Sequence, residues 1–318
     1  TITFDTLADG VYNCTAVLTD SAGNRSLPLT LTPFVIDTSA PVAPTALDMV
    51  AASDSGDSDS DNLTNVRQPT FTVTVPADAA NVLFFANGAQ IGTSVPTSTT
   101  VTYMSYTSLD DGNYSITAKS VDAAGNQSAA PSGLAITIDG TAPTTSITST
   151  ETGPVLAAGF PVAVTFSEPV VSTPTVTPGN GQAGTVTTDD NTIFNFRVFP
   201  DETGPVTVDV PAGTTADLAG NLNVAASQFS INADVTNPTI LSVLRGFNGA
   251  SRIPETTSLD VVSWFVKFSE DIIRPVASDF SVTGTTSPIT ISEVNADEYE
   301  ISLAGGDIAT VNGTVTLS

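Results

Sequence analysis

Apolar and polar residues alternate in short runs along most of the chain. The run 71–76 reads FTVTVP, the run 161–167 reads PVAVTFS and the run 192–199 reads TIFNFRVF. Because a period of two puts every second side chain on the same face, these runs predict β-strands with one buried face. Further runs of this kind are NVLFFA (81–86), AQIGTS (89–94), NYSITAKSVD (113–122), GLAITID (133–139), PVTVDV (205–210) and SQFSI (227–231).

Turn-forming residues separate these runs. Asn87-Gly88 lies between two of them, and this dipeptide is typical of two-residue hairpin turns because both residues tolerate positive φ. The chain contains 21 prolines, while Leu, Lys, Arg and Glu, which favour helices, are scarce. The composition predicts an all-β protein, and no apolar run approaches the roughly 18 residues that a membrane helix needs.

Residues 7–41 and 109–143 form an internal repeat that aligns without a gap. A third copy of its loop, DLAGN, spans 217–221, and a second repeat pairs VTFSEPV (164–170) with VKFSEDI (266–272). The identities of the first repeat are Leu7/Leu109, Gly10/Gly112, Tyr12/Tyr114, Asp20/Asp122, Gly23/Gly125, Asn24/Asn126, Asp37/Asp139 and Pro41/Pro143.

The repeats place module boundaries near Pro41, Pro143 and Pro238. We therefore predict the C-terminal part of a first module at 1–41, complete second and third modules at 42–143 and 144–238, and a truncated fourth module, of the third module's subtype, at 239–318. About 100 residues with about seven short strands is what an immunoglobulin-like β-sandwich requires. The predicted fold is an elongated array of tandem sandwiches, continuing into a longer protein.

Three residues carry more specific structural expectations. Tyr12 and Tyr114 follow a DG turn, which fits either a tyrosine corner or an ordinary cross-strand aromatic. Trp264 lies in the alternating run VVSWFVKFS and is expected in the core or on a sheet face. Cys14, the single cysteine, takes the place of Ile116 in the repeat and is expected to be a small buried side chain.

The formal net charge of −25 limits the possible partners. Two lysines and six arginines cannot form the basic face that binds phosphates, so nucleic acid and anionic membrane surfaces are poor partners. Because the chain contains no histidine, Ser-His-Asp and Cys-His nucleophiles and His-ligated metals are excluded. We therefore expect no enzymatic activity.

The pattern LxDGxYxxTAxxxDxAGNxSxxxxxxxxxIDxTAP resembles the bacterial Ig-like repeats of giant type-1-secreted RTX and biofilm-associated adhesins. The VTFSEPV and VKFSEDI modules resemble a second Ig-like subtype of the same proteins. The resemblance covers nearly the whole chain, although Ser39 replaces the usual linker Thr and Asn237 replaces Ala. It implies export to the cell surface, rigidity that depends on calcium, and a role as spacer or adhesin.

The run SDSGDSDSDNLTN at 53–65 is a candidate calcium loop. Calcium takes six to eight oxygen ligands, and closely spaced carboxylates in a short loop can supply several. The run lacks the closing Glu of an EF-hand, and a solvated acidic loop is the alternative interpretation. The candidate ligands are Asp54, Asp57, Asp59 and Asp61.

Strand parity predicts further calcium ligands at the module junctions. A module of seven antiparallel strands has a leading end, where the chain enters, and a trailing end, where it leaves. The trailing end contains loop 53–65, Asp110, Asp111 and Asp139, and the leading end contains the DxAGN loop. Because the trailing end of one module adjoins the leading end of the next, Asp122 and Asn126 should face Asp37, and Asp217 and Asn221 should face Asp139. Alternatively, the Asp of DxAGN simply caps backbone amides of a turn.

These observations predict a calcium-stiffened spacer segment of a secreted bacterial adhesin, active in cell adhesion and biofilm formation. Its partners would be the neighbouring modules of the same chain, with host or surface glycans and proteins bound through other regions. Two alternatives stay open: a module that itself binds a glycan or protein, and a non-catalytic array attached to an exported hydrolase.

Overall fold

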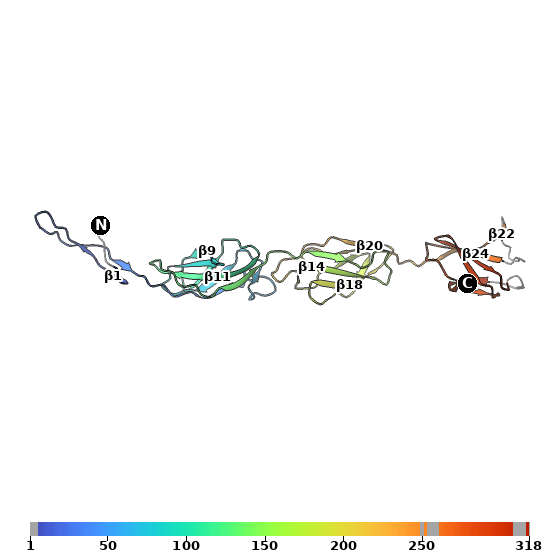
Figure 1. Ribbon diagram of the computed structural model, residues 1–318, viewed down its shortest axis with the longest axis horizontal. Helices are drawn as coiled ribbons and strands as arrows, with labels where there is room; N and C mark the ends of the chain where they lie inside the picture. Colours follow the sequence, from blue (N-terminus) through green and yellow to red (C-terminus); the bar gives the residue numbers. More distant parts are fainter. Residues whose placement is uncertain (1–5, 249–250, 253–260, 308–315, 318) are drawn as a thin grey trace. The chain divides into compact units, whose positions relative to one another are not determined.

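The computed structural model describes residues 6–248, 251–252, 261–307 and 316–317. They form strands, turns and loops, with one 3₁₀ turn, η1 (Ala277–Asp279). The chain divides into two compact units, 1–234 and 235–318, and Figure 1 colours it along the sequence. The predicted all-β fold of tandem immunoglobulin-like sandwiches is confirmed, while the four module boundaries stay a prediction.

Residues 6–41 form two narrow antiparallel ribbons. In one, Tyr12 pairs with Phe34, and the two rings stack at 5.5 Å. No side chain between residues 6 and 40 is buried, and Cys14 is half-buried. The ribbon strands are β1 (Gly10–Tyr12) with β4 (Phe34–Ile36), and β2 (Thr15–Ala16) with β3 (Leu29–Thr30).

The second module is a two-sheet sandwich. The first sheet has the order β10-β7-β5, and the second has the order β6-β12-β11-β8-β9, in which β6 and β12 are parallel. Phe71 and Phe84 are fully buried between them with Ile116 and Ile138. The strands are β5 (Thr45–Met49), β6 (Leu63–Thr64), β7 (Thr70–Thr74), β8 (Asn81–Ala86), β9 (Ala89–Ser94), β10 (Thr100–Met104), β11 (Gly112–Val121) and β12 (Leu134–Ile138).

Two local features of the first two modules agree with the sequence: the predicted hairpin turn and the tyrosine corner. Asn87 and Gly88 turn from β8 into β9 with φ of 50° and 82°, as a two-residue hairpin turn requires. Tyr114 donates its hydroxyl to the carbonyl of Asp110 at 3.1 Å, and Tyr12 donates to the carbonyl of Ala8 at 2.8 Å. Both tyrosines therefore form a tyrosine corner, and Tyr12 also stacks across the ribbon.

The third module repeats the two-sheet plan with different strands. One sheet has the order β13-β14-β18-β16, with β17 also on β18, and the other has the order β15-β19-β20. Phe160, Val164 and Phe194 are buried between them. The strands are β13 (Thr145–Thr148), β14 (Phe160–Phe166), β15 (Thr177–Gly179), β16 (Gly181–Ala183), β17 (Thr187–Thr188), β18 (Ile193–Pro200), β19 (Gly204–Asp209) and β20 (Phe229–Ala233).

The second unit contains a four-stranded sheet, β21-β24-β27-β26. Trp264 on β24 is 9% exposed and packs with Val262 and Leu303, which confirms its expected place in the core. Within the predicted fourth module, residues 249–250, 253–260, 308–315 and 318 lie outside the described residues. The strands are β21 (Ile240–Arg245), β22 (Phe247–Asn248), β23 (Ser251–Arg252), β24 (Val261–Phe268), β25 (Val282–Thr283), β26 (Ile289–Asn295), β27 (Glu298–Ala304) and β28 (Thr316–Leu317).

None of the helices in the described part of the chain is long and apolar enough to span a membrane.

Candidate metal centre at a module junction

The three copies of the DxAGN loop share one hydrogen-bond network. In the third module, the amide NH and the Nδ2 of Asn221 donate to the Oδ1 and Oδ2 of Asp217, both at 2.9 Å. Asn126 binds Asp122 in the same way, and Asn24 binds Asp20. The fourth residue of each loop is a glycine with φ between 88° and 95° (Gly23, Gly125 and Gly220), a conformation that favours glycine. The Asp therefore caps a turn in all three copies.

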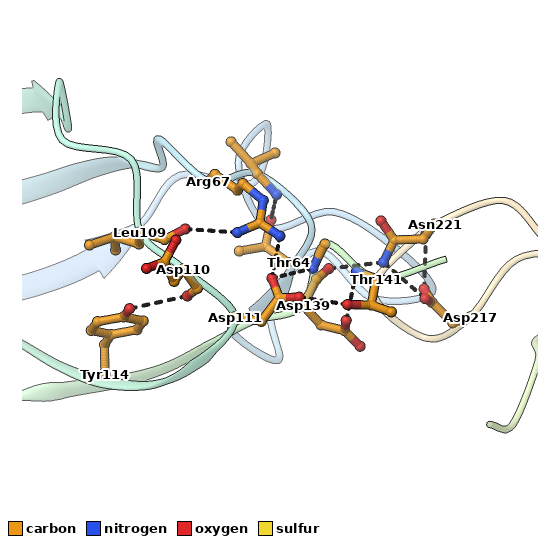
Figure 2. Close-up of polar contacts among 12 residues, drawn as sticks. Thr64, Arg67, Leu109, Asp110, Asp111, Tyr114, Asp139, Thr141, Asp217 and Asn221 are labelled. Atoms are coloured by element: carbon orange, nitrogen blue, oxygen red, sulfur yellow. Dashed lines mark hydrogen bonds and ion pairs between the residues drawn. The ribbon is translucent and has the colours of Figure 1, made fainter. Parts of the chain in front are cut away.

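The asparagine of two of these loops also contacts the preceding linker. Asn126 donates from Nδ2 to the carbonyl of Asp37 at 2.9 Å, and Asn221 donates to the carbonyl of Asp139 at 2.9 Å. Figure 2 shows Asn221 between Asp139 and Asp217. The structure thus brings together the residues that strand parity predicts at the two junctions.

Three carboxylates meet at the second junction. Oxygen atoms of Asp139, Glu168 and Asp217 all lie within 4.8 Å of one another. Asp139 directly follows β12 and Glu168 lies in the segment after β14, while a bridge between Val170 and Asp217 holds that segment against the DLAGN loop. In the described part of the chain, this is the one place where three acidic side chains lie so close together.

The cluster is electrostatically unfavourable when it holds no cation. Burial, followed by the charges of Asp139 and Asp217, raises the pKa of Glu168 above its ordinary value. Asp217 is 2% exposed, and its carboxylate accepts hydrogen bonds from Asn221. A cation at this position would offset the mutual repulsion of the three carboxylates.

Glu168 was not among the predicted site residues. Its signal was the repeated segment VTFSEPV and VKFSEDI, in which Ser-Glu follows the last strand residue, Phe166 or Phe268, of β14 and β24. Nothing in that pattern pairs the glutamate with Asp139 or Asp217, because the contact depends on how the third module packs against the linker.

Asp111 contacts the linker rather than the carboxylate cluster. It pairs with Nη2 of Arg67 at 2.6 Å and accepts hydrogen bonds from the amide of Gly140 at 2.9 Å and the hydroxyl of Thr141 at 2.6 Å (Figure 2). The hydrogen bond from Thr141, more than any other contact, lowers its pKa. Asp9 holds Thr38 and Ser39 in the equivalent position. Asp110 is exposed, and its carbonyl accepts the Tyr114 hydroxyl.

The acidic loop 53–65 contains one buried carboxylate and three exposed ones. Asp54 is 3% exposed; its Oδ2 accepts the amide of Asn62 at 3.0 Å, and its Oδ1 is buried without a hydrogen-bond partner. Burial, more than the nearby charges, raises its pKa. Asp57, Asp59 and Asp61 are exposed. The structure does not bring three of these carboxylates within 4.8 Å.

Loop 53–65 also contacts the DLAGN loop of the third module directly. The amide of Asp57 donates to the carbonyl of Leu218 at 3.2 Å, and the hydroxyl of Ser55 donates to the carbonyl of Ala219 at 2.9 Å. Gly56, with φ of 105°, lies so close to Leu218 that a Cβ would collide with the Leu218 carbonyl. Only glycine fits at this position.

The residues at the second junction suit a hard divalent cation. Asp139, Glu168 and Asp217 supply carboxylate oxygen only, which is the ligand chemistry of calcium rather than of zinc or copper. The three ligands come from the second module's linker and two segments of the third module. An ion held by all three would therefore bind both modules at once.

The comparison with protein families agrees with the Ig-like fold of the second module. The family model of the bacterial Ig-like domain matches residues 41–140. No curated protein matches the sequence. Among solved structures, the fibronectin(III)-like modules of CbhA from Clostridium thermocellum are 13% identical, with a TM-score of 0.27 over 60% of this chain and 94% of that chain.

Two further structures share low identity with the chain. Invasin, a bacterial integrin-binding protein, is 14% identical with a TM-score of 0.36, over 87% of this chain and 56% of that one. The Bacteroides ovatus protein SGBP-B, solved with a mixed-linkage heptasaccharide, is 14% identical with a TM-score of 0.20, over 86% of this chain and 64% of that one. The match to the bacterial Ig-like domain thus covers nearly all of the predicted second module, 42–143.

Proposed function

We propose that this chain is a non-catalytic spacer segment of an extracellular bacterial adhesin, and that calcium stiffens it at the junction between the second and third modules. The observation that carries the proposal is the approach of Asp139, Glu168 and Asp217 to within 4.8 Å. These residues belong to two modules, so a shared ion couples the modules mechanically.

The energetics of the site support a metal-dependent switch. Without a cation, burial and then the charges of Asp139 and Asp217 disfavour the charged form of Glu168 and raise its pKa. A divalent cation reverses the sign of that interaction. Because calcium binds the closed junction in preference to an open one, it stabilises the closed form by mass action. Extracellular modules typically bind calcium at about 10⁻⁴–10⁻³ M, so such a site is filled outside the cell.

The first junction differs from the second. Asn126 contacts Asp37 there, but in the described residues no third acidic side chain joins Asp37 and Asp122 within 4.8 Å. Calcium binding by Asp37 and Asp122 therefore stays a prediction. We assign the stiffening role to the second junction.

Calorimetric titration of the 318-residue chain with calcium tests the proposal. Glu168→Gln should abolish or greatly weaken the binding step because it removes one charged ligand and keeps the side-chain shape. Glu151→Gln is the matched control, since Glu151 is exposed in the same module and should leave binding unchanged. If the two variants bind calcium like the unaltered chain, the junction is not the calcium site.

A further inference from the structure

One DxAGN loop is covered by another part of the chain, whereas two equivalent loops are open. Ala219, in the third module's loop, is 1% exposed beneath residues 55–57. The corresponding Ala124 and Ala22 are exposed. A Cβ on Gly220 would lie 3.1 Å from Gly56, but a Cβ on Gly125 or Gly23 would meet nothing within 4 Å.

The open loops have the same shape as the covered one. Their capping hydrogen bonds match to within about 0.1 Å, and their glycines adopt φ of 88° and 94°, compared with 95° for Gly220. The backbone carbonyls that bind the covering turn, those of Leu218 and Ala219, correspond to the carbonyls of Ala123 and Ala124. The binding surface is therefore formed before its partner arrives.

Backbone atoms and small side chains determine what fits this surface. The covering turn contributes one hydroxyl, from Ser55, and one amide, from Asp57, and it passes so close that Gly56 carries no side chain. The asparagine at the fifth loop position also donates a hydrogen bond to the preceding linker, as Asn126 does to the carbonyl of Asp37. At the second module's loop the linker contact is thus made, and none of the described residues covers Ala124 or Gly125.

We propose that residues 122–126 are a docking surface for a Ser-Gly-Asp turn presented by an adjacent Ig-like module, of the kind that residues 55–57 present to the third module. Residues 20–24 offer the same surface. The observed turn makes two hydrogen bonds to the loop, so we expect the contact to be effective only where the two modules are linked and the turn is held at high effective concentration. The contact needs no metal and is independent of the calcium proposal.

A chimeric chain tests this directly. Residues 7–41 align with 109–143 without a gap, so a second copy of 42–143 can be inserted after residue 41 in the same register, which keeps the Asp37 contact of the upstream loop. The chimera places a turn 55–57 ahead of the loop 122–126 of the downstream copy. Amide NMR spectra recorded in chelator then report on Ala123, Ala124 and Gly125 in both copies.

The chimera should give two sets of signals for these three amides. One set should match the 318-residue chain, and the other should be shifted by the docked turn. Gly56→Val in the upstream copy should move the second set of amide signals back to the positions of the first set, because the valine side chain collides with the loop. Since valine also strains a backbone at positive φ, Ala124→Glu in the downstream copy is a second block, placed on an exposed side chain. A single set in the chimera, or a second set that persists in both variants, would overturn the proposal.

Discussion

Asn221 donates one hydrogen bond to the carbonyl of Asp139, in the linker, and a second to the carboxylate of Asp217, in its own loop, both at 2.9 Å. One amide group therefore connects the second module's exit to the third module's turn. The same side chain thus joins the backbone of one residue of the candidate metal centre, Asp139, to the carboxylate of another, Asp217. The order of this junction thus depends on a neutral hydrogen bond as well as on charge.

Replacing the loop asparagines should separate their two roles. Asn126→Ala and Asn221→Ala remove the capping bond and the linker bond, while Asn24→Ala removes a side-chain bond to Asp20 in the matched loop. Each lost bond should cost about 0.5–1.5 kcal/mol. Hydrogen exchange at the linker amides that follow Asp37 and Asp139 should accelerate in the first two variants only. Equal exchange in all three variants would mean that the linker contacts contribute no order.

The stability of the unit 1–234 should depend on pH through Glu168. Its folded pKa is raised above the ordinary 4.5, so the folded chain retains a proton that the unfolded chain has released. The free energy of unfolding therefore falls as pH rises from about the ordinary pKa through the folded pKa, and the loss is fully present above it. In chelator, acidification through this window should raise the melting temperature of the unaltered chain relative to Glu168→Gln. A constant difference between the two across the window would contradict the assignment.

Millimolar calcium should remove this pH dependence, because a bound cation favours the charged carboxylate. A second effect, the loss of stability in acid, occurs over a separate and lower pH range. The lowered pKa values of Asp111 and Asp122 give stability that is present above their ordinary 3.8 and is lost as pH falls through their folded pKa. The two effects can therefore be distinguished in one titration.

Asp54 provides a test of the acidic loop. Its buried Oδ1 lacks a hydrogen-bond partner, and burial raises its pKa, so the charged form is unfavourable without a cation. Asp54→Asn should raise the melting temperature of the unit 1–234 in chelator. If the loop also binds calcium as its sequence predicts, the same variant should reduce the rise that calcium produces. Exposed Asp78→Asn, in the same module and outside the loop, is the matched control. An undiminished calcium effect in Asp54→Asn would leave the loop as an acidic docking segment alone.

The sequence predicted more of the fold than of the candidate metal site. Alternation along 71–76 and 161–167 correctly predicted strands, the repeat correctly aligned Asn126 with the third loop, and parity predicted their approach to Asp37 and Asp139. Periodicity and repeat spacing are local signals, so they predict strands and equivalent loops without any knowledge of tertiary packing. The contact of Glu168 with Asp217, and that of Gly56 with Leu218, join segments far apart in sequence and follow from how the modules dock. No local pattern encodes either contact.

The central claim, that calcium stiffens the second junction, is tested most directly by a distance distribution across it. Spin labels at Thr93 and Thr187, which are exposed in the second and third modules, would be measured by pulsed electron paramagnetic resonance after Cys14→Ser. The account predicts a narrow distribution in calcium, a broader one in chelator, and a width insensitive to calcium in Glu168→Gln. Distributions of equal width in calcium and in chelator for the chain with Glu168 intact would contradict it.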